Sequence, residues 1–255
     1  MKKINLLIIL IVSSHAIAQV PGLGLDTNIN KTDVSQNKQG LWKEKIGNMS
    51  AVGNYLNNKK DGAWKSYYPD GMIGNIDEYK EDKKNGISIE IKNTGYMRRE
   101  CYYKNDNLNG TYKLYGINGR PELEANYANG KLNGPRKLYY QSTTLQEESN
   151  YIDDKRDGLT KWYYDDGKIS IEYNYVNGSL EGIQKSYYKE GAINSETMYK
   201  GNAMQGDYKE YFEDGKTLKV SGYYSNDKKE GVWKEYDLNG KIIKTEKYKN
   251  DEVIK

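Results

Sequence analysis

The sequence predicts an all-β protein, an elongated single-layer antiparallel array of about nine β-hairpin repeats. Three observations support this fold class. Glycine recurs every 22 to 25 residues, a period that marks a stack of supersecondary units. Asp-Gly and Asn-Gly pairs stand between short half-apolar runs, which is the strongest local signal for a hairpin turn. No segment has the sustained apolar period of an amphipathic helix, so strands are expected throughout the repeats.

The first 18 residues have the three parts of an export signal. Lys2 and Lys3 form a basic start, residues 4–12 are an apolar run interrupted by one Asn, and residues 16–18 (Ala-Ile-Ala) are small where a signal peptidase cuts. The alternative is an uncleaved N-terminal anchor, but the run is short for a membrane span. We predict a signal peptide over 1–18, an exported protein in the periplasm, on the cell surface or in the medium, and no integral membrane span after cleavage.

A polar stretch over 19–39 is interpreted as a flexible lead-in, and the repeat domain follows over 40–255. The repeat glycines are Gly40, Gly62, Gly86, Gly110, Gly134, Gly158, Gly182, Gly206 and Gly231. We number each repeat from this glycine as position zero. Seven of the eight repeats from Gly62 onward have a second glycine at position 9, and all eight have tyrosine at position 17. Each repeat therefore predicts a strand, a turn at position 9, a second strand ending at Tyr, and a connecting turn.

A two-residue turn at Asp-Gly sets the expected register. It places position 3 opposite position 14, position 6 opposite position 11, and the repeat glycine opposite the tyrosine at position 17. Lys then faces Glu, as in Lys161 with Glu172, and Tyr164 faces Ile169. A three-residue loop with a bulge is the competing register, and it would swap the two faces of a hairpin. The fourth hairpin from Gly62 has Gln-Ser-Thr-Thr over 141–144 in place of the turn glycine, so we expect it to be irregular.

In this register the two faces of the sheet differ. A packing face collects the repeat glycine, the aromatic residues at positions 2, 6 and 17, and the aliphatic residues at position 11. The opposite face carries Lys and Glu ladders and a row of tyrosines at position 5. Tyrosine offers apolar area with a polar tip, so this second face is the candidate binding surface. Its residues are Tyr67, Tyr115, Tyr139, Tyr163, Tyr187, Tyr211 and Tyr236, with Lys113, Lys137, Lys161 and Lys185.

Composition excludes much chemistry. The one histidine, His15, leaves with the signal, and Cys101 is the one thiol, which we expect to be buried in a strand. A mature chain without His has no Ser-His-Asp system, and one Cys makes neither a disulfide nor a thiolate-rich zinc site. We therefore predict no catalytic residue, cofactor or metal site. The alternative is a carboxylate-based hydrolase at the irregular fourth hairpin, near Glu147 and Glu148. The near-neutral mature chain has no charge excess that would favour nucleic acid.

The repeats contain a segment such as Asn-Gly-Lys-Leu-Asn-Gly over 129–134, an aromatic residue shortly after it, and a later Asp-Gly-Lys turn followed by a strand that ends in Tyr. In these features the repeat resembles a MORN repeat in its bacterial variant form. The resemblance covers residues 40–255. It implies a MORN-like meander of hairpins. Proteins of the similar YwqK type are often labelled antitoxins, and other MORN proteins are regarded as scaffolds or membrane-associated modules.

These observations predict a non-catalytic, extracytoplasmic repeat protein that serves as a binding or scaffold surface. The expected partner is a protein or an extended glycan, and the copies have the means to self-associate through the aromatic face or the sheet edges. The alternative function is that of an antitoxin-like or immunity-like protein that neutralises a partner protein by covering it.

Overall fold

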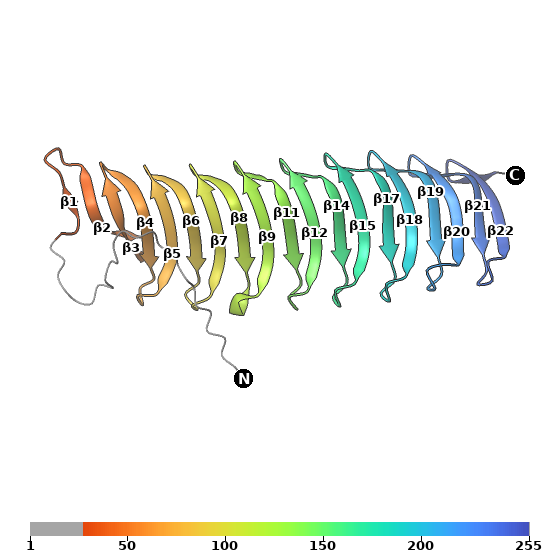
Figure 1. Cartoon of the computed structure of the whole chain (residues 1–255), viewed down its shortest axis with the longest axis horizontal. Helices are drawn as coiled ribbons and strands as arrows, with labels where there is room; N and C mark the ends of the chain where they lie inside the picture. Colours follow the sequence, from red (N-terminus) through yellow and green to blue (C-terminus); the bar gives the residue numbers. More distant parts are fainter. Residues whose placement is uncertain (1–27, 255) are drawn as a thin grey trace, which may run out of the picture.

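The computed structural model describes residues 28–254, which form one open antiparallel sheet of 23 strands (Figure 1). The sheet is elongated along the direction in which the hairpins stack. Within 28–254 there is no α-helix, and one 3-10 turn, η1 (Ile117–Gly119), lies in a hairpin loop. The predicted all-β hairpin array is confirmed. The predicted signal peptide and residues 19–27 of the lead-in lie outside the described residues.

Each hairpin begins with a strand that contains the repeat glycine. In six repeats this strand is continuous: β2 (Lys38–Ile46), β4 (Lys59–Tyr67), β6 (Lys83–Ile91), β8 (Asn107–Tyr115), β19 (Ala203–Tyr211) and β21 (Lys228–Tyr236). In three repeats it is split just before the glycine: β10 (Lys131–Leu132) with β11 (Gly134–Tyr139), β13 (Lys155–Arg156) with β14 (Gly158–Tyr163), and β16 (Ser179–Leu180) with β17 (Gly182–Tyr187).

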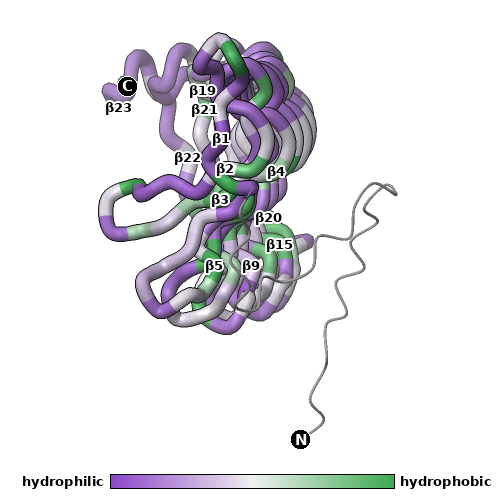
Figure 2. Tube along the Cα trace, turned by 90° about the vertical axis from the view of Figure 1, so that its left-hand side faces the viewer, coloured by the Kyte–Doolittle hydropathy of each residue, from purple (hydrophilic) through white to green (hydrophobic). Residues whose placement is uncertain are grey.

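The second strand of each hairpin carries the tyrosine that faces the glycine. These strands are β3 (Met49–Leu56), β5 (Ile73–Lys80), β7 (Met97–Lys104), β9 (Pro121–Ala128), β12 (Leu145–Ile152), β15 (Ile169–Val176), β18 (Ile193–Lys200), β20 (Leu218–Ser225) and β22 (Ile242–Lys249). Strands that follow each other in the chain are neighbours in the sheet. Seen end-on, successive hairpins lie behind one another and their strands are curved (Figure 2).

Short strands partly cover both ends of the sheet. At the first end, β1 (Lys31–Thr32) pairs with the start of β2, and the side-chain amide of Asn30 exchanges hydrogen bonds with the backbone of Lys43. Within the predicted lead-in, Lys31 and Thr32 are thus paired with Gln39 and Lys38. At the other end, β23 (Glu252–Ile254) covers only the last residues of β22. Short edge strands of this kind limit uncontrolled strand pairing.

The central register of the hairpins is the predicted one. The repeat glycine faces tyrosine, as in Gly158 with Tyr175, and Lys161 faces Glu172. The same pairing recurs for Lys113 with Glu124, Lys137 with Glu148, and Lys185 with Glu196.

Near the turn, the predicted pairing of position 6 with position 11 is wrong. Ile169 pairs with Tyr163 rather than Tyr164, and Ile193 pairs with Tyr187 rather than Tyr188. Tyr164 N donates to the Lys168 carbonyl and Gly167 N to the Tyr164 carbonyl, which defines a three-residue loop. A bulge one step into the strand restores the two-residue register beyond it. Each of the two competing registers therefore describes one part of the hairpin.

Two further expectations are corrected by the loops. The fourth hairpin is regular, because Thr143 adopts a left-handed φ of 73° and makes the turn bond that glycine makes elsewhere. In the repeat of Gly206, the loop is one residue longer, since Phe212 N bonds the Thr217 carbonyl. Gly206 consequently faces Tyr224 instead of Tyr223 at position 17.

The faces also differ from expectation at one row. Because position 11 lies opposite the tyrosine at position 5, its aliphatic side chain belongs to the face of the Lys and Glu rows, which we call the ladder face. The other face, which we call the aromatic face, carries position 2, position 17 and their neighbours. On it large residues alternate with small ones: Gly53 lies between Trp42 and Trp64, and Gly222 between Tyr208 and Trp233. The two tryptophans whose rings lie against these glycines, Trp64 and Trp233, are buried.

The connecting turns stack on one another through side chains. Asn105 and Asp106 both have positive φ, as a tight hairpin turn requires. Asp106 N donates to the Lys84 carbonyl, and the Asp106 carboxylate accepts the Lys84 backbone N–H at 2.7 Å. The same side-chain contact recurs at Asn58, Asp82, Asp154, Asn202, Asp227 and Asp251.

We expect Asp106→Ala to destabilise the array by about 1–2 kcal/mol, because it removes this acceptor and leaves a non-glycine residue in the left-handed region. Asp106→Asn keeps both the acceptor and the tolerance for positive φ, so it is the matched control. Urea unfolding followed by circular dichroism measures the difference. Equal midpoints for the two variants would show that the stacked turns do not depend on the side chain.

Candidate binding surfaces

The ladder face carries an unbroken row of alternating charges. Lys at position 3 pairs with Glu in its own hairpin and also with Glu of the preceding one, so acid and base alternate across ten adjacent strands. The row runs through Glu100, Lys113, Glu124, Lys137, Glu148, Lys161, Glu172, Lys185, Glu196 and Lys209. Each opposite-charge pair contributes a few tenths of a kcal/mol, and the row as a whole holds the register.

The ladder lysines named from the sequence lie in this row. Lys137, Lys161 and Lys185 form ion pairs of 3.5–3.7 Å with the glutamate of their own hairpin. Lys113 lies opposite both Glu100 and Glu124. The sequence register accounts for the pairs within hairpins, whereas the pairs between hairpins depend on how neighbouring repeats stack.

The tyrosines at position 5 tie neighbouring repeats together on this face. The hydroxyls of Tyr163, Tyr187 and Tyr211 donate to the glutamate at position 14 of the preceding repeat, at 3.3, 2.7 and 3.1 Å. Tyr236 contacts Ser221 at the equivalent place. All seven predicted tyrosines lie in this one row and are half-buried: Tyr67, Tyr115, Tyr139, Tyr163, Tyr187, Tyr211 and Tyr236.

Burial and the neighbouring carboxylates keep the phenols of Tyr139, Tyr163, Tyr187 and Tyr211 protonated. Burial, followed by the hydrogen bond to Glu172, raises the pKa of Tyr187 to about 12. The pKa values of Tyr139, Tyr163 and Tyr211 are also raised, in each case first by burial. The hydroxyls therefore stay hydrogen-bond donors to glutamate at any physiological pH.

Beside the charge row, the ladder face exposes an aliphatic cluster, which we call the aliphatic patch. It consists of Ile152, Leu159, Val176 and Ile183, each 49–53% exposed. Leu159 faces Asn174, two residues from Val176, and it is followed two residues later by Lys161 of the charge row. Cross-strand diagonal neighbours of this kind are within contact reach of aliphatic side chains. The patch thus lies in the middle of the array, alongside the ion pairs.

The aromatic face has a buried ionic cluster at its centre. Glu147 is 1% exposed, and its Oε1 accepts from Arg156 at 2.7 Å, Arg136 at 3.3 Å and Ser149 at 2.8 Å. Glu148 lies on the ladder face, where it pairs with Lys137. The two carboxylates named from the sequence therefore point to opposite faces of the sheet and do not form a pair.

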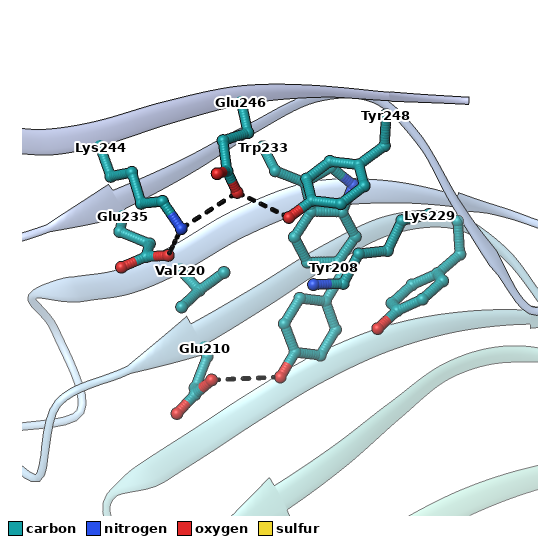
Figure 3. Close-up of a pocket in the computed structure, with 10 residues that line it drawn as sticks. Tyr208, Glu210, Val220, Lys229, Trp233, Glu235, Lys244, Glu246 and Tyr248 are labelled. Carbon is teal, nitrogen blue, oxygen red and sulfur yellow. Dashed lines mark hydrogen bonds and ion pairs between the residues drawn. The ribbon is translucent and has the colours of Figure 1, made fainter. Parts of the chain in front are cut away.

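At the last two repeats, the aromatic face is hollowed (Figure 3). The hollow has a volume of about 190 Å³, and Trp233 packs against Tyr208, Tyr224 and Tyr248 around it. The ammonium of Lys229 lies 4.4 Å from the centre of the Trp233 ring. Glu246 holds Lys244 at 3.1 Å and accepts from Tyr248 at 2.7 Å, as the dashed lines show. The aromatic rings are packed on each other, and the open wall is charged.

Lysine or arginine over the aromatic rings is a repeated feature of this face that the sequence reading missed. Lys60 lies 4.0 Å from the centre of the Trp64 ring, and Arg156 lies over both Tyr151 and Tyr175. These residues stand two before the repeat glycine. The recurrence of Lys or Arg at that position, two residues ahead of glycine, is the signal that would have found it.

Cys101 is fully buried on the aromatic face, and burial raises the pKa of its thiol. We expect Ellman's reagent to label native protein at least roughly tenfold more slowly than protein unfolded in urea. In the native fold the reagent cannot reach the buried sulfur, and the raised pKa keeps Cys101 as a thiol rather than the reactive thiolate. Rapid labelling of native protein would contradict the placement. In residues 28–254 no cluster of His, Cys, Asp and Glu has metal-binding geometry, and no helix there is long and apolar enough to cross a membrane.

Fold and surfaces together define a single-sheet β-hairpin repeat protein. Four stretches match the family model of the MORN repeat variant: 60–81, 156–177, 180–200 and 229–250. Each stretch corresponds to one hairpin of the array. Over these four hairpins the chain is thus similar to the MORN repeat variant family, as the sequence resemblance implied. The YwqK-type label stays a prediction. No curated protein matches the chain significantly.

Proposed function

We propose that the chain is a non-catalytic scaffold that acts outside the cytoplasm and binds a protein partner along the ladder face. The family match supports a repeat-type binding or scaffold role. The export-signal features of residues 1–18 support a location in the periplasm, on the cell surface or outside the cell.

The aliphatic patch is the observation that carries the choice of a protein partner. Four half-exposed aliphatic side chains on neighbouring strands offer apolar area that a partner would remove from water. The adjoining charges are already paired, so covering them leaves no single unpaired charge behind.

A glycan is less well matched to this face. Sugar binding needs bare aromatic rings and free hydrogen-bonding groups, whereas the tyrosine hydroxyls here are bound to glutamate and the most exposed apolar residues are aliphatic. The tyrosines at position 5 then contribute ring area at the border of the interface rather than its polar contacts.

The test is a double substitution in the patch, Leu159→Asp with Ile183→Asp. Partner protein recovered with the wild-type chain from the native envelope is purified, and its dissociation constant is measured for each variant. We expect at least about a tenfold loss for the double variant, because it removes two apolar contacts and buries two carboxylates. Leu238→Asp is the control, since Leu238 is 71% exposed in the last hairpin turn and outside the patch.

Equal binding by the double variant and the control would contradict the proposal, as would recovery of glycan without protein. A single stoichiometric protein partner whose activity is abolished on binding would identify the role as the antitoxin-like or immunity-like alternative.

A further inference from the structure

The charge row of the ladder face loses its acids near the C-terminal end. Beyond Glu196 the row continues as Lys209, Ser221, Lys234 and Thr245 on adjacent strands. Two lysines thus flank a serine at the position where the five hairpins from Gly86 to Gly182 have glutamate.

The chain itself shows what this arrangement holds. In the preceding repeats, a glutamate carboxylate lies between two lysines and accepts the hydroxyl of the next tyrosine at position 5. Glu172, for example, lies between Lys161 and Lys185 and accepts from Tyr187 at 2.7 Å. Glu148 and Glu196 repeat this geometry with Tyr163 and Tyr211. In each of these three places, a glutamate between two lysines therefore accepts a hydrogen bond from one tyrosine hydroxyl.

At Ser221 the surrounding groups are present without the carboxylate. Tyr236 places its hydroxyl 3.1 Å from the Ser221 hydroxyl, where the other tyrosines meet glutamate. Neither Lys209 nor Lys234 forms an ion pair within 4.0 Å with any residue of 28–254. The acid next to this row on the same strand is Asp207, which faces Tyr223 one row away. Serine is shorter than glutamate, Lys209 is exposed, and Ser221 and Lys234 are half-buried, so an incoming group can reach these donors from solvent.

We propose that Lys209, Ser221, Lys234 and Tyr236 form a carboxylate-binding site that takes an acidic side chain of a protein partner. Two ammonium groups and two hydroxyls are donors suited to a carboxylate. The site lies in the same row and on the same face as the central ion pairs, so a partner on the aliphatic patch reaches it by extending along the array. This assignment of partner rests on the proposed function, whereas the carboxylate site itself rests on the geometry.

The test uses a fluorescent hexaglutamate peptide, with hexaglutamine as the neutral probe, and measures anisotropy at low ionic strength. Wild-type protein is expected to bind hexaglutamate and not hexaglutamine. Ser221→Glu supplies the missing carboxylate in place of the ligand, so we expect it to weaken peptide binding at least about tenfold while the urea midpoint stays equal or rises. Glu172→Ser should create a second site and increase the number of peptides bound.

Lys65→Ala is the matched control, because Lys65 lies in the same row at the other end, where both of its cross-strand neighbours, Val52 and Ile76, are aliphatic. Equal peptide binding by wild type and Ser221→Glu would overturn the site, as would displacement of the peptide by inorganic phosphate at micromolar concentration, which would assign it to free anions. Leu159→Asp with Ile183→Asp should leave peptide binding unchanged, so a failure of this site is distinguishable from a failure of the aliphatic patch.

Discussion

Trp233→Ala is expected to destabilise the C-terminal repeats by about 3–5 kcal/mol, the cost of removing a large buried aromatic side chain. The ring lies against Gly222 and packs with Tyr208, Tyr224 and Tyr248, so its loss opens the hollow across three strands. Urea unfolding followed by circular dichroism measures the effect, and limited proteolysis locates it in the last two repeats.

Gly222 provides the matched partner for this experiment. A Cβ added there would overlap the Trp233 ring, so Gly222→Ala alone should cost about 1–3 kcal/mol by overpacking. With Trp233→Ala the added methyl enters vacated space, and the double variant should be more stable than the sum of the two single effects implies. Strict additivity would show that the ring does not lie on this glycine.

Glu147→Ala is expected to be the second large effect, about 3–5 kcal/mol, because it leaves Arg136 and Arg156 without their shared partner at a buried site. Glu148→Ala, one residue away on the ladder face, is the control and should cost less than about 1 kcal/mol, since its ion pair with Lys137 is 42% exposed on the glutamate side. Thermal and urea unfolding of the two variants compare the faces directly. Similar losses for both would contradict the burial of Glu147.

Much of the fold follows from sequence period and turn chemistry. The 24-residue glycine spacing and the Tyr at position 17 locate each hairpin, and the Lys and Glu pairing fixes its central register. The bulge was not predictable. A three-residue loop with one bulged residue places Lys161 opposite Glu172, and so does a two-residue loop without a bulge, so the number of residues between the two is the same in both cases. In the repeat of Gly206 the loop has one residue more than in the other repeats, and no change in the strands compensates for it. Gly206 therefore pairs with Tyr224 instead of Tyr223.

The candidate surface was only partly predictable. The alternation of side chains along a strand placed the tyrosines at position 5 and the lysines at position 3 on one face. The hydrogen bond from the Tyr187 hydroxyl to Glu172, in contrast, joins two different repeats. The Arg136–Glu147–Arg156 cluster likewise joins two neighbouring repeats, since Arg156 belongs to the repeat of Gly158. Contacts of this kind depend on the stacking of repeats, which the pattern within one repeat does not describe.

The most direct test of binding through the ladder face is lysine acetylation footprinting of the chain with and without its protein partner. The two faces carry separate lysines, with Lys137, Lys161 and Lys185 in the charge row and Lys60 and Lys229 over the rings of the aromatic face. We expect the partner to protect the three ladder lysines and to leave the other two unchanged. Protection of Lys60 and Lys229, with the ladder lysines still reactive, would contradict it.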